Sequence, residues 1–532
     1  MLIVLVEITA LVDAAGTPTV LCFSSGRGYN HPSAPGFYDP RVVQPANFER
    51  HVFDGGRTGG RSTTGAGELR LANADGALDT CKDFGFDGQR LAVRIGDDQG
   101  PYETFTTLLV GTMEQAEFTW TELVLRIRDR QAELDRPVQT HLFAGTNAGS
   151  PLAGIEGRQG DIKGSPKPLC YGAVFRVPAI PVNTEKLIFQ VHDGPIEDVP
   201  AAYDNGVLLT KGADYASQSD MEANAPAVGT YRVWQAGGCF RLGSAPTGTI
   251  SADVRGDASG AGYISTMADI MRRIVVDKAG IADGDIVEGD LAALNAANSS
   301  TIGIWVSEPK TVAEVLDELA ASVGAWWGFD RLGRFRVVRL AAPSGAPAIV
   351  LKRLDGITAA GAGDGDIIEL ERVASHDPGR GLPVWRVALD YLKAYTSVSF
   401  QTGGASPTER AFVAREFRTA TASDVSVKTQ HALATTLQVT SLLTEEGDAL
   451  AEAARLLALY KVKREMLRVR VRLDVALAGA VDLGAIVELR MPRFGWTDGK
   501  LFLVIGMTYQ AAGRRDPPGD GFAATLDLTL WG

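Results

Sequence analysis

Residues 481–532 contain three short runs whose hydrophobic patterns strongly constrain the fold. In the first run, one side is apolar, and it comprises Val481, Leu483, Ala485, Val487, Leu489 and Met491. Asp482, Glu488 and Arg490 fall on the other side, which we expect to be the wet one. This period-two alternation predicts a half-buried strand. Pro492 should end it, because proline has no N–H for the strand ladder.

Two more strands are predicted to follow. Residues 501–509 are nearly all apolar, which is typical of a strand buried on both faces. In the last run, Leu526, Leu528 and Leu530 alternate with Thr525, Asp527 and Thr529. The turns between these strands lack recognisable catalytic motifs, so this end of the chain resembles a building block more than an enzyme.

The composition favours a globular protein of several domains. With 532 residues, of which 45% are apolar and 22% charged, the chain has room for about three or four domains. Its net charge of −12 argues against a protein that binds nucleic acid tightly, since phosphate contacts need Lys and Arg.

Residues 1–11 predict a first strand rather than a signal peptide or membrane span, because they lack a basic start and contain Glu7. We therefore expect a soluble protein made in the cytosol.

The pattern along the chain predicts four segments and a mainly β (α+β) multidomain fold. Residues 1–150 form an N-terminal β domain, in which Leu123, Leu125 and Ile127 alternate with Glu122, Arg126 and Arg128. Residues 151–256 form a second β-rich domain, with a tight hairpin turn at Asn205-Gly206. Residues 257–345 form a helix-plus-hairpin module, and residues 346–532 a barrel-like β domain with one helix.

Two helices are defined by their apolar spacing. The first begins after Thr311, which forms a capping box with Glu314, and it ends at Gly324. A hairpin with its turn at residues 331–333 follows it. The second lies near residues 445–463, where the apolar stripe is predicted to be Leu450, Ala453, Leu456, Leu457 and Tyr460, with Asp448 and Glu452 facing outward.

Motifs for chemistry are weak in this sequence. Residues 495–501 and 361–366 contain glycines but lack the spacing of phosphate-binding loops, and both predict turns. Asp283, Asp285, Glu288 and Asp290 predict a solvated acidic loop, with a weak divalent-cation site as the alternative. The four cysteines, Cys22, Cys81, Cys170 and Cys239, are far apart and predict free thiols rather than a metal framework.

The histidines and tryptophans raise two further possibilities, a hydrolase site and a sugar-binding site. The six histidines, His31, His51, His141, His192, His376 and His431, are scattered and match no hydrolase motif, although a spatial triad would leave no local trace. Trp326 and Trp327 predict core packing for one ring and a sheet edge or interface for the other, with a sugar-binding platform as the alternative. The sequence thus predicts no catalytic, cofactor-binding or metal-binding residues and no cofactor.

Several stretches resemble the hub proteins of tail tips and baseplates in long-tailed, Mu-like bacteriophages. They cover most of the chain and comprise residues 68–79, 167–178, 190–195, 311–337, 491–495, 499–507 and 526–530. The resemblance implies two barrel-like β domains per subunit and a ring, commonly a homotrimer, that matches a sixfold tail tube. It also implies partners: a distal tail or tail tube protein, the tape-measure protein, and a central fibre or spike protein.

The resemblance makes a structural virion protein at the tail tip, without enzymatic activity, the leading interpretation. DNA would pass through its lumen without specific binding, and no direct membrane insertion is expected. An acidic lumen would suit this passage, because it repels phosphates. Two alternatives stay open: a tail-associated hydrolase of cell wall or glycan, which would use paired carboxylates or a Cys/His pair, and a receptor-binding or carbohydrate-binding β protein with the Trp pair as its platform.

Overall fold

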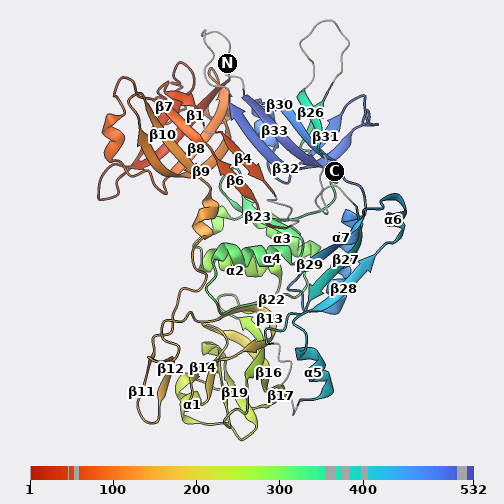
Figure 1. The fold of residues 1–532 in the computed structure, drawn as a ribbon. Helices are drawn as coiled ribbons and strands as arrows, with labels where there is room; N and C mark the ends of the chain where they lie inside the picture. Colours follow the sequence, from red (N-terminus) through yellow and green to blue (C-terminus); the bar gives the residue numbers. More distant parts are fainter. Residues whose placement is uncertain are drawn as a thin grey trace.

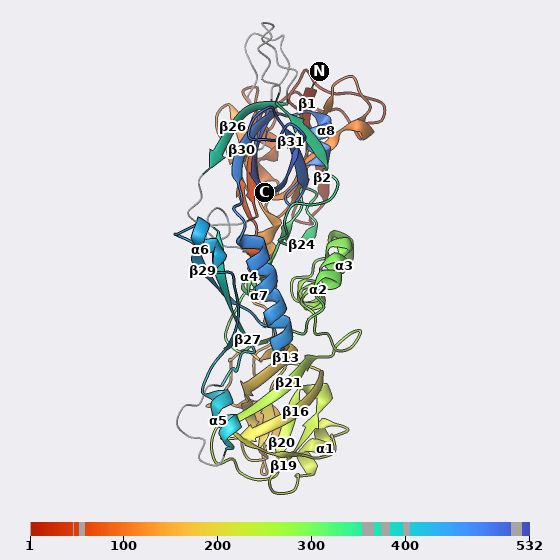
Figure 2. The same cartoon turned by 90° about the vertical axis from the view of Figure 1, so that its right-hand side faces the viewer.

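The computed structural model describes residues 2–45, 47–52, 59–353, 366–373, 383–396, 405–511 and 524–532. Its described part is an elongated molecule built mainly of β-sheets (Figures 1 and 2). Two sheets lie side by side at one end, a layer of helices lies beneath them, and a second pair of sheets forms the opposite end. Residues 361–365 and His376, which figure in the sequence patterns, lie outside the described residues.

The N-terminal part forms a seven-stranded sheet with the order β2-β1-β8-β9-β10-β7-β3. The predicted first strand and the alternating strand at residues 122–128 are both present. The apolar side chains of β10 are buried, as the alternation predicts. The strands are β1 (Leu2–Leu11), β2 (Pro18–Ser24), β3 (Val42–Gln44), β7 (Glu68–Ala72), β8 (Arg90–Asp97), β9 (Thr106–Phe118) and β10 (Glu122–Arg128). Three short 3-10 helices accompany them: η1 (Asp79–Asp83), η2 (Tyr102–Thr104) and η3 (Arg130–Leu134).

The far end of the molecule contains two five-stranded sheets with a shared apolar core around Tyr231 and Phe240. The predicted turn at Asn205-Gly206 is confirmed: both residues have positive φ, 51° and 81°, and they join two antiparallel strands. One sheet contains β13 (Leu169–Pro178), β16 (Ile196–Asp204), β17 (Val207–Leu208), β21 (Ile250–Asp257) and β22 (Gly303–Val306). The other contains β14 (Ile180–Asn183), β15 (Ile188–Gln190), β18 (Thr210–Lys211), β19 (Thr230–Trp234) and β20 (Cys239–Leu242). A two-stranded ribbon, β11 (Thr146–Ala148) and β12 (Ala153–Arg158), the helix α1 (Gln218–Ala223) and the 3-10 helix η4 (Gln235–Gly237) complete it.

The middle layer contains the predicted helix and hairpin. The Thr311 hydroxyl accepts from the Glu314 N–H, and the Glu314 carboxylate accepts from the Thr311 N–H at 2.7 Å, so the capping box is confirmed. Gly324 ends this helix with a φ of 60°. The elements are α2 (Met267–Asp277), η5 (Asp283–Asp285), α3 (Glu288–Ala297), α4 (Val312–Ala321), β23 (Ala325–Phe329) and β24 (Phe335–Arg339), and β5 (Gly60–Arg61) pairs with β23.

The C-terminal sheet lies beside the N-terminal one (Figure 1) and curls into a partial barrel (Figure 2). Its main path runs β25-β31-β32-β33-β30-β26, and β4 (Phe48–His51) joins it by pairing with β32, followed by β6 (Thr63–Ala66). Strands from the first 70 residues thus belong to the C-terminal sheet. The other members are β25 (Ile349–Lys352), β26 (Ile367–Val373), β30 (Met466–Arg472), β31 (Ile486–Arg490), β32 (Lys500–Ala511) and β33 (Ala524–Trp531), with α8 (Val475–Ala480) between β30 and β31.

A small sheet with helices on its flank links the C-terminal sheet to the rest of the chain. It contains β27 (Val384–Tyr391), β28 (Arg418–Ser423) and β29 (Thr435–Thr440), and the short helix α6 (Ser426–Gln430) lies against β27. The short helix α5 (Pro407–Val413) lies beside the far sheets instead (Figure 1), where its Glu409 pairs with Arg176 on β13. The helix α7 (Glu446–Tyr460) runs lengthwise along this sheet (Figure 2). In the described part of the chain, no helix is long and apolar enough to span a membrane.

Two details of the sequence-based prediction are wrong. The predicted strand from Val481 is shorter than expected, because residues 481–485 follow helix α8 as a loop and β31 begins at Ile486. In α7, Leu450 is exposed by 44%, while Glu452 is buried rather than outward-facing. The apolar stripe is instead completed by Ala449, Ala453, Leu456 and Tyr460.

Candidate functional site

The described residues of the C-terminal sheet form a polar hollow of about 590 Å³, which we call the concave face. It is lined mainly by polar side chains from five strands: Glu49, His51, Glu369, Glu371, Arg468, Arg470, Thr508, Gln510, Asp527 and Thr529. The period-two pattern creates it: Leu526, Leu528 and Leu530 turn into the core, so Asp527 and Thr529 must face the other way. A sheet with one face in the core thereby has a second, wet face.

Strand register aligns these side chains into two rows across the sheet. One row consists of Glu49, Thr508, Asp527, Arg470 and Glu369, each directly opposite the next. The neighbouring row consists of His51, Gly506, Thr529, Arg468 and Glu371. Directly opposed residues on one face are close enough for their side chains to interact. The two rows therefore form continuous ladders from β4 to β26.

Gly506 has a specific reason to be glycine in the second row. A Cβ atom at this position would lie 2.4 Å from Nδ1 of His51 and 3.0 Å from Cβ of Thr529. The His51 ring therefore occupies the space where a side chain of residue 506 would stand, which brings it close to the sheet. His51 Nε2 lies 2.6 Å from the Glu49 carboxylate.

The charges of the concave face are paired but leave a negative excess. Arg470 binds Asp527 through two contacts of 2.7 and 2.9 Å, and it binds Glu369 at 3.0 Å. Arg468 lies 3.8 Å from Glu371. Among the lining residues, four carboxylates (Glu49, Glu369, Glu371 and Asp527) face two guanidinium groups, so the balance is −2 with His51 neutral.

This arrangement does not favour glycosidase chemistry. Glycoside hydrolysis needs one carboxylic acid that is held protonated beside an ionised partner. Asp527 and Glu369 instead both pair with the same guanidinium group, that of Arg470. The concave face is therefore a surface of paired charges.

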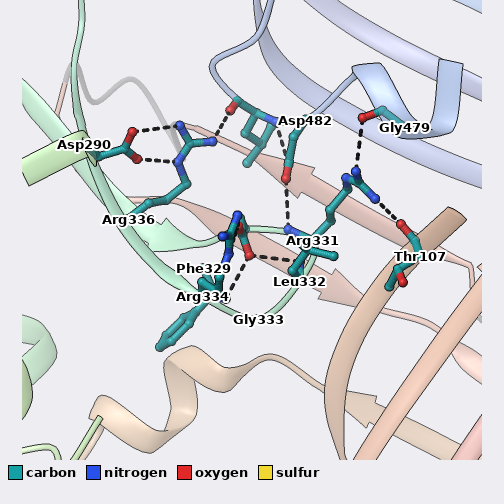
Figure 3. A network of polar contacts seen from close by, with 12 residues as sticks. Thr107, Asp290, Phe329, Arg331, Leu332, Gly333, Arg334, Arg336, Gly479 and Asp482 are labelled. Carbon is teal, nitrogen blue, oxygen red and sulfur yellow. Dashed lines mark hydrogen bonds and ion pairs between the residues drawn. The ribbon is translucent and has the colours of Figure 1, made fainter. Parts of the chain in front are cut away.

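A second polar cluster, which we call the junction, lies where the N-terminal and C-terminal sheets meet the middle layer (Figure 3). We call these two sheets the upper sheets. The centre of the junction is Asp482, in the loop between α8 and β31. One carboxylate oxygen lies 2.6 Å from Arg50 Nη1 on β4, and the other accepts from the Arg331 N–H at 2.9 Å. Burial alone would raise the pKa of Asp482, but Arg50 and the N–H groups of Arg331 and Leu483 outweigh burial and lower it.

Arginines extend the junction in three directions. From the hairpin turn, Arg331 reaches the carbonyls of Thr107 on β9 and of Gly479 on α8, as Figure 3 shows. Arg336 on β24 donates to the Leu483 carbonyl at 3.1 Å and pairs with Asp290 at 2.8 Å. Arg50 also donates to the Phe329 carbonyl. The N-terminal sheet, the hairpin and the C-terminal sheet are thus bound to one another at a single point.

The acidic loop predicted from the sequence also becomes part of an ionic framework. Asp283 and Glu288 both pair with Arg272, Asp285 pairs with Arg130 at 3.1 Å, and Asp290 pairs with Arg336. Three arginines thus pair with the four carboxylates, and Asp283 and Glu288, which share Arg272, stay exposed as the sequence predicts. Within the described ranges, no three His, Cys, Asp or Glu residues gather to hold a metal ion.

Glu452 forms a third buried cluster, between α7 and the hairpin. Its side chain is 1% exposed, and it pairs with Arg339 on β24 and with Arg455 at 2.7 Å. Arg455 also donates to the Leu340 carbonyl at 2.8 Å. A buried carboxylate held by two arginines explains why a glutamate stands on the inner face of α7.

The tryptophan pair does not form a platform. Trp326 and Trp327 are exposed by only 1% and 0%, so both rings lie in the core rather than one in the core and one at an edge. The Trp327 indole N–H donates to Asp317 on α4 at 3.0 Å. The sugar-binding alternative that depends on this pair is therefore wrong.

A histidine and a cysteine come together in the core of the far sheets, but they do not form a nucleophile and base. His192 is buried, and its Nδ1 accepts from the backbone N–H of Cys170 at 2.9 Å. Burial, together with Asp257 nearby, raises the pKa of the Cys170 thiol far above its ordinary value. Such a thiol stays protonated at neutral pH and is a poor nucleophile. All four cysteines are free, and three of them are buried.

Sequence reasoning missed most of these contacts because they join distant positions. Arg50 and Asp482 are 432 residues apart, and Arg331 and Thr107 are 224 apart. No local pattern connects them. The wet side predicted for residues 481–491 is wrong at Asp482, whose carboxylate points into the junction, whereas Val487 and Leu489 are in the core as expected.

The chain matches no family model and no curated protein. Solved structures that match include a tail protein from Neisseria meningitidis (11% identity, 99% of this chain and 96% of that chain, TM-score 0.39). A 43 kDa tail protein of prophage MuSo2 from Shewanella oneidensis also matches (10% identity, 100% and 98%, TM-score 0.39). A third match is a chain of a native gene transfer agent particle (15% identity, 70% and 85%, TM-score 0.39). These structural neighbours are tail and virion proteins, the class that the sequence motifs resemble.

Proposed function

We propose that this chain is a structural virion protein, the hub of a phage tail tip or baseplate. In this role it forms a ring that connects the tail tube to the central fibre or spike and surrounds the DNA channel. The observation that carries the proposal is the pairing of two β-sheets, one of them curled, that a buried ionic junction holds in a fixed relation.

A ring wall must keep its shape under load, and the junction suits this need. The Arg50 side chain is 3% exposed and the Asp482 side chain 18%, so their ion pair is shielded from solvent and salt. Breaking such a buried pair leaves an uncompensated charge, which costs about 3–5 kcal/mol. Asp482 also accepts from the Arg331 N–H, and Arg331 donates to the Thr107 carbonyl on β9. Rotation of one sheet against the other would break this series of contacts. Each subunit therefore presents its two sheets as one rigid piece.

The number of sheets fits the expected symmetry. Three copies of a chain with two upper sheets would place six such sheets around an axis, as a sixfold tail tube requires. The homotrimer remains a proposal, as do the neighbours: a distal tail or tail tube protein on one side, a central fibre or spike protein on the other, and the tape-measure protein inside. The virion tail tip would be the final location, after synthesis in the host cytoplasm.

The concave face is the surface that we propose for the lumen. Its two ladders carry a net charge of −2 per chain, and this charge repeats in every copy around the ring. A wall with this sign repels DNA phosphates, so DNA passes without being captured. The paired arginines keep the carboxylates fixed without reversing the sign.

The proposed role assigns the segments different tasks. Residues 1–150 and 346–532 would form the ring, with β4 and β6 exchanged into the C-terminal sheet. Residues 257–345 would hold the two sheets together from below. Residues 151–256 would form the arm at the opposite end of the molecule (Figure 1), which leaves it available for a neighbouring protein.

Imaging of whole particles tests the proposal. A particle reconstruction should show this chain as a closed ring at the end of the tail tube, with the C-terminal sheet toward the axis. Particles that lack the chain should have no attached fibre or spike. A chain found outside the tail, or purified chain that degrades peptidoglycan or glycan, would refute the structural role.

A further inference from the structure

The turn between β9 and β10 presents a tryptophan to solvent. Trp120 is 94% exposed, and Phe118 beside it is 37% exposed. A large aromatic side chain usually buries 150–250 Å² in a folded protein, so leaving one almost entirely in water is costly. Within the described part of the chain, the Trp120 indole N–H has no hydrogen-bond partner. We call residues 118–122 the Trp120 turn.

The Trp120 turn is held in one conformation. The Thr119 N–H donates to the Glu122 carbonyl at 2.8 Å, and the Thr119 hydroxyl oxygen accepts from the Glu122 N–H at 2.9 Å. The Asn73 N–H donates to the Thr121 carbonyl at 2.7 Å. A rigid turn that presents an aromatic ring loses little conformational entropy on binding. Trp is also enriched among the residues that dominate binding energy at interfaces.

The same N-terminal sheet contains an apolar groove along its edge strand β2, which we call the β2 groove. Its volume is about 860 Å³, in the range of pockets that hold ligands. Val20 and Phe37 on its walls are exposed by 58% and 57%. Its other apolar lining residues include Val12, Leu21, Phe23, Leu78 and Phe84.

Glu7 is the charged residue among the described residues that line the β2 groove. Its Oε1 atom accepts hydrogen bonds from the hydroxyls of Tyr38 and Tyr102 and from Arg94 Nε at 3.0 Å. The second oxygen, Oε2, accepts none from the described residues. Arg94 already neutralises the carboxylate, so a cationic ligand would gain little there. A neutral N–H donor with an apolar body fits better, and an indole ring has both properties.

We propose that Trp120 of one copy of this chain binds in the β2 groove of a second copy, with its indole N–H directed to Glu7. The turn and the groove share no residue, and β2 lies three and four strands away from β9 and β10 in the sheet. A contact between two different surfaces leaves one of each free on every pair, so further copies can add, and the assembly becomes a ring when the rotation between copies closes. Only the closure of the assembly into a ring rests on the proposed function. The contact between Trp120 and the β2 groove does not depend on it.

Sedimentation velocity of the full chain tests the contact with two variants, one on each side. Trp120→Ala removes the inserted ring, and we expect self-association to weaken by about 30-fold or more, the size of an interface hot spot. Val20→Glu places a charge in the groove and should weaken it equally. A 1:1 mixture of the two variants retains one intact turn and one intact groove. It should form heterodimers but nothing larger.

Matched controls are available at other exposed apolar positions. Val228→Ala, at a site 82% exposed, and Leu433→Glu, at a site 76% exposed, should leave self-association unchanged. Circular dichroism should be identical for all variants, since each changed side chain is exposed. A wild-type chain that is monomeric at every concentration would overturn the contact, and so would a Trp120→Ala variant that assembles normally or a mixture that stays monomeric. The position of the chain in particles is measured separately, so a failed contact and a failed hub role are distinguishable.

Discussion

Arg50 joins the C-terminal sheet to the hairpin at the junction. It lies on β4, a strand from the first 70 residues that has joined the C-terminal sheet, and its guanidinium is almost fully buried. It binds Asp482 and the Phe329 carbonyl, so it contacts the C-terminal loop and the hairpin together. A buried arginine is tolerated only while both contacts persist.

Replacing Asp482 with asparagine tests this dependence. Asp482→Asn keeps the shape of the side chain but leaves the Arg50 charge unpaired, and we expect the apparent free energy of unfolding to fall by about 3 kcal/mol or more. Denaturant unfolding followed by fluorescence measures the change. Glu371→Gln is the matched control, because Glu371 and Arg468 are each 65% exposed and 3.8 Å apart. Its effect should stay below about 1 kcal/mol. Equal effects for the two variants would contradict the role of the junction.

The same pair predicts how stability depends on pH. The folded pKa of Asp482 lies below its ordinary value of 3.8, because Arg50 and two N–H groups outweigh burial. A lowered folded pKa contributes stability above the unfolded pKa, and this contribution is lost as the pH falls through the folded pKa. The stability difference between wild type and Asp482→Asn should therefore be constant above about pH 5 and should shrink below about pH 4. Unfolding curves measured from pH 7 to pH 3 give this difference, and a gap that widens in acid would contradict the assignment.

At the scale of single elements, α4 shows how local sequence can determine a boundary. The Thr311–Glu314 capping box satisfies N–H groups of the first helical turn, which have no partners within the helix. Thr311→Ala should lower the free energy of unfolding by about 1 kcal/mol. Glu314→Gln keeps a side-chain oxygen that can accept from the Thr311 N–H, so it should cost only a few tenths of a kcal/mol. Thermal unfolding of both variants checks the order, and a larger loss for Glu314→Gln would contradict it.

The strands and helices that sequence alone predicted well are those with a local cause. β10, β33 and α4 follow from alternation or capping, and the turn at Asn205-Gly206 follows from two residues that accept positive φ. The errors occur where a distant partner decides. Glu452 looks like a surface residue of α7 until Arg339, 113 positions away, is placed beside it. Asp482 continues an alternating pattern in sequence, but Arg50 draws it into the junction.

At the scale of the whole molecule, the sequence predicted a mainly β, multidomain architecture but not how the sheets combine. Neither the exchange of β4 into the C-terminal sheet nor the two ladders of the concave face has a local signal, since both depend on register between strands far apart in the chain. The Trp120 turn was also missed, because an exposed and a buried tryptophan look alike in sequence. The charge of the concave face is nevertheless the property that links the architecture to the proposed channel.

Reversing that charge tests whether the concave face lines a DNA channel. The double substitution Glu369→Lys and Glu371→Lys changes the balance on this face from −2 to +2, since each replacement shifts the charge by two. Particles with this variant should assemble but release DNA more slowly on triggering, because lysines would hold phosphates that the wild-type wall repels. High salt should restore the rate, since screening shortens the range of such attraction to about 3 Å at 1 M.

The matched control places the same charge change elsewhere. Asp161→Lys with Glu197→Lys alters two exposed residues at the far end of the molecule and should leave DNA release unchanged. The measurement is the rate of dye-detected DNA release from purified particles at low and high salt. If both double variants slow release equally, the effect comes from overall charge rather than from the channel wall. If neither does, the concave face does not contact DNA, and the lumen must be lined by another surface of the ring.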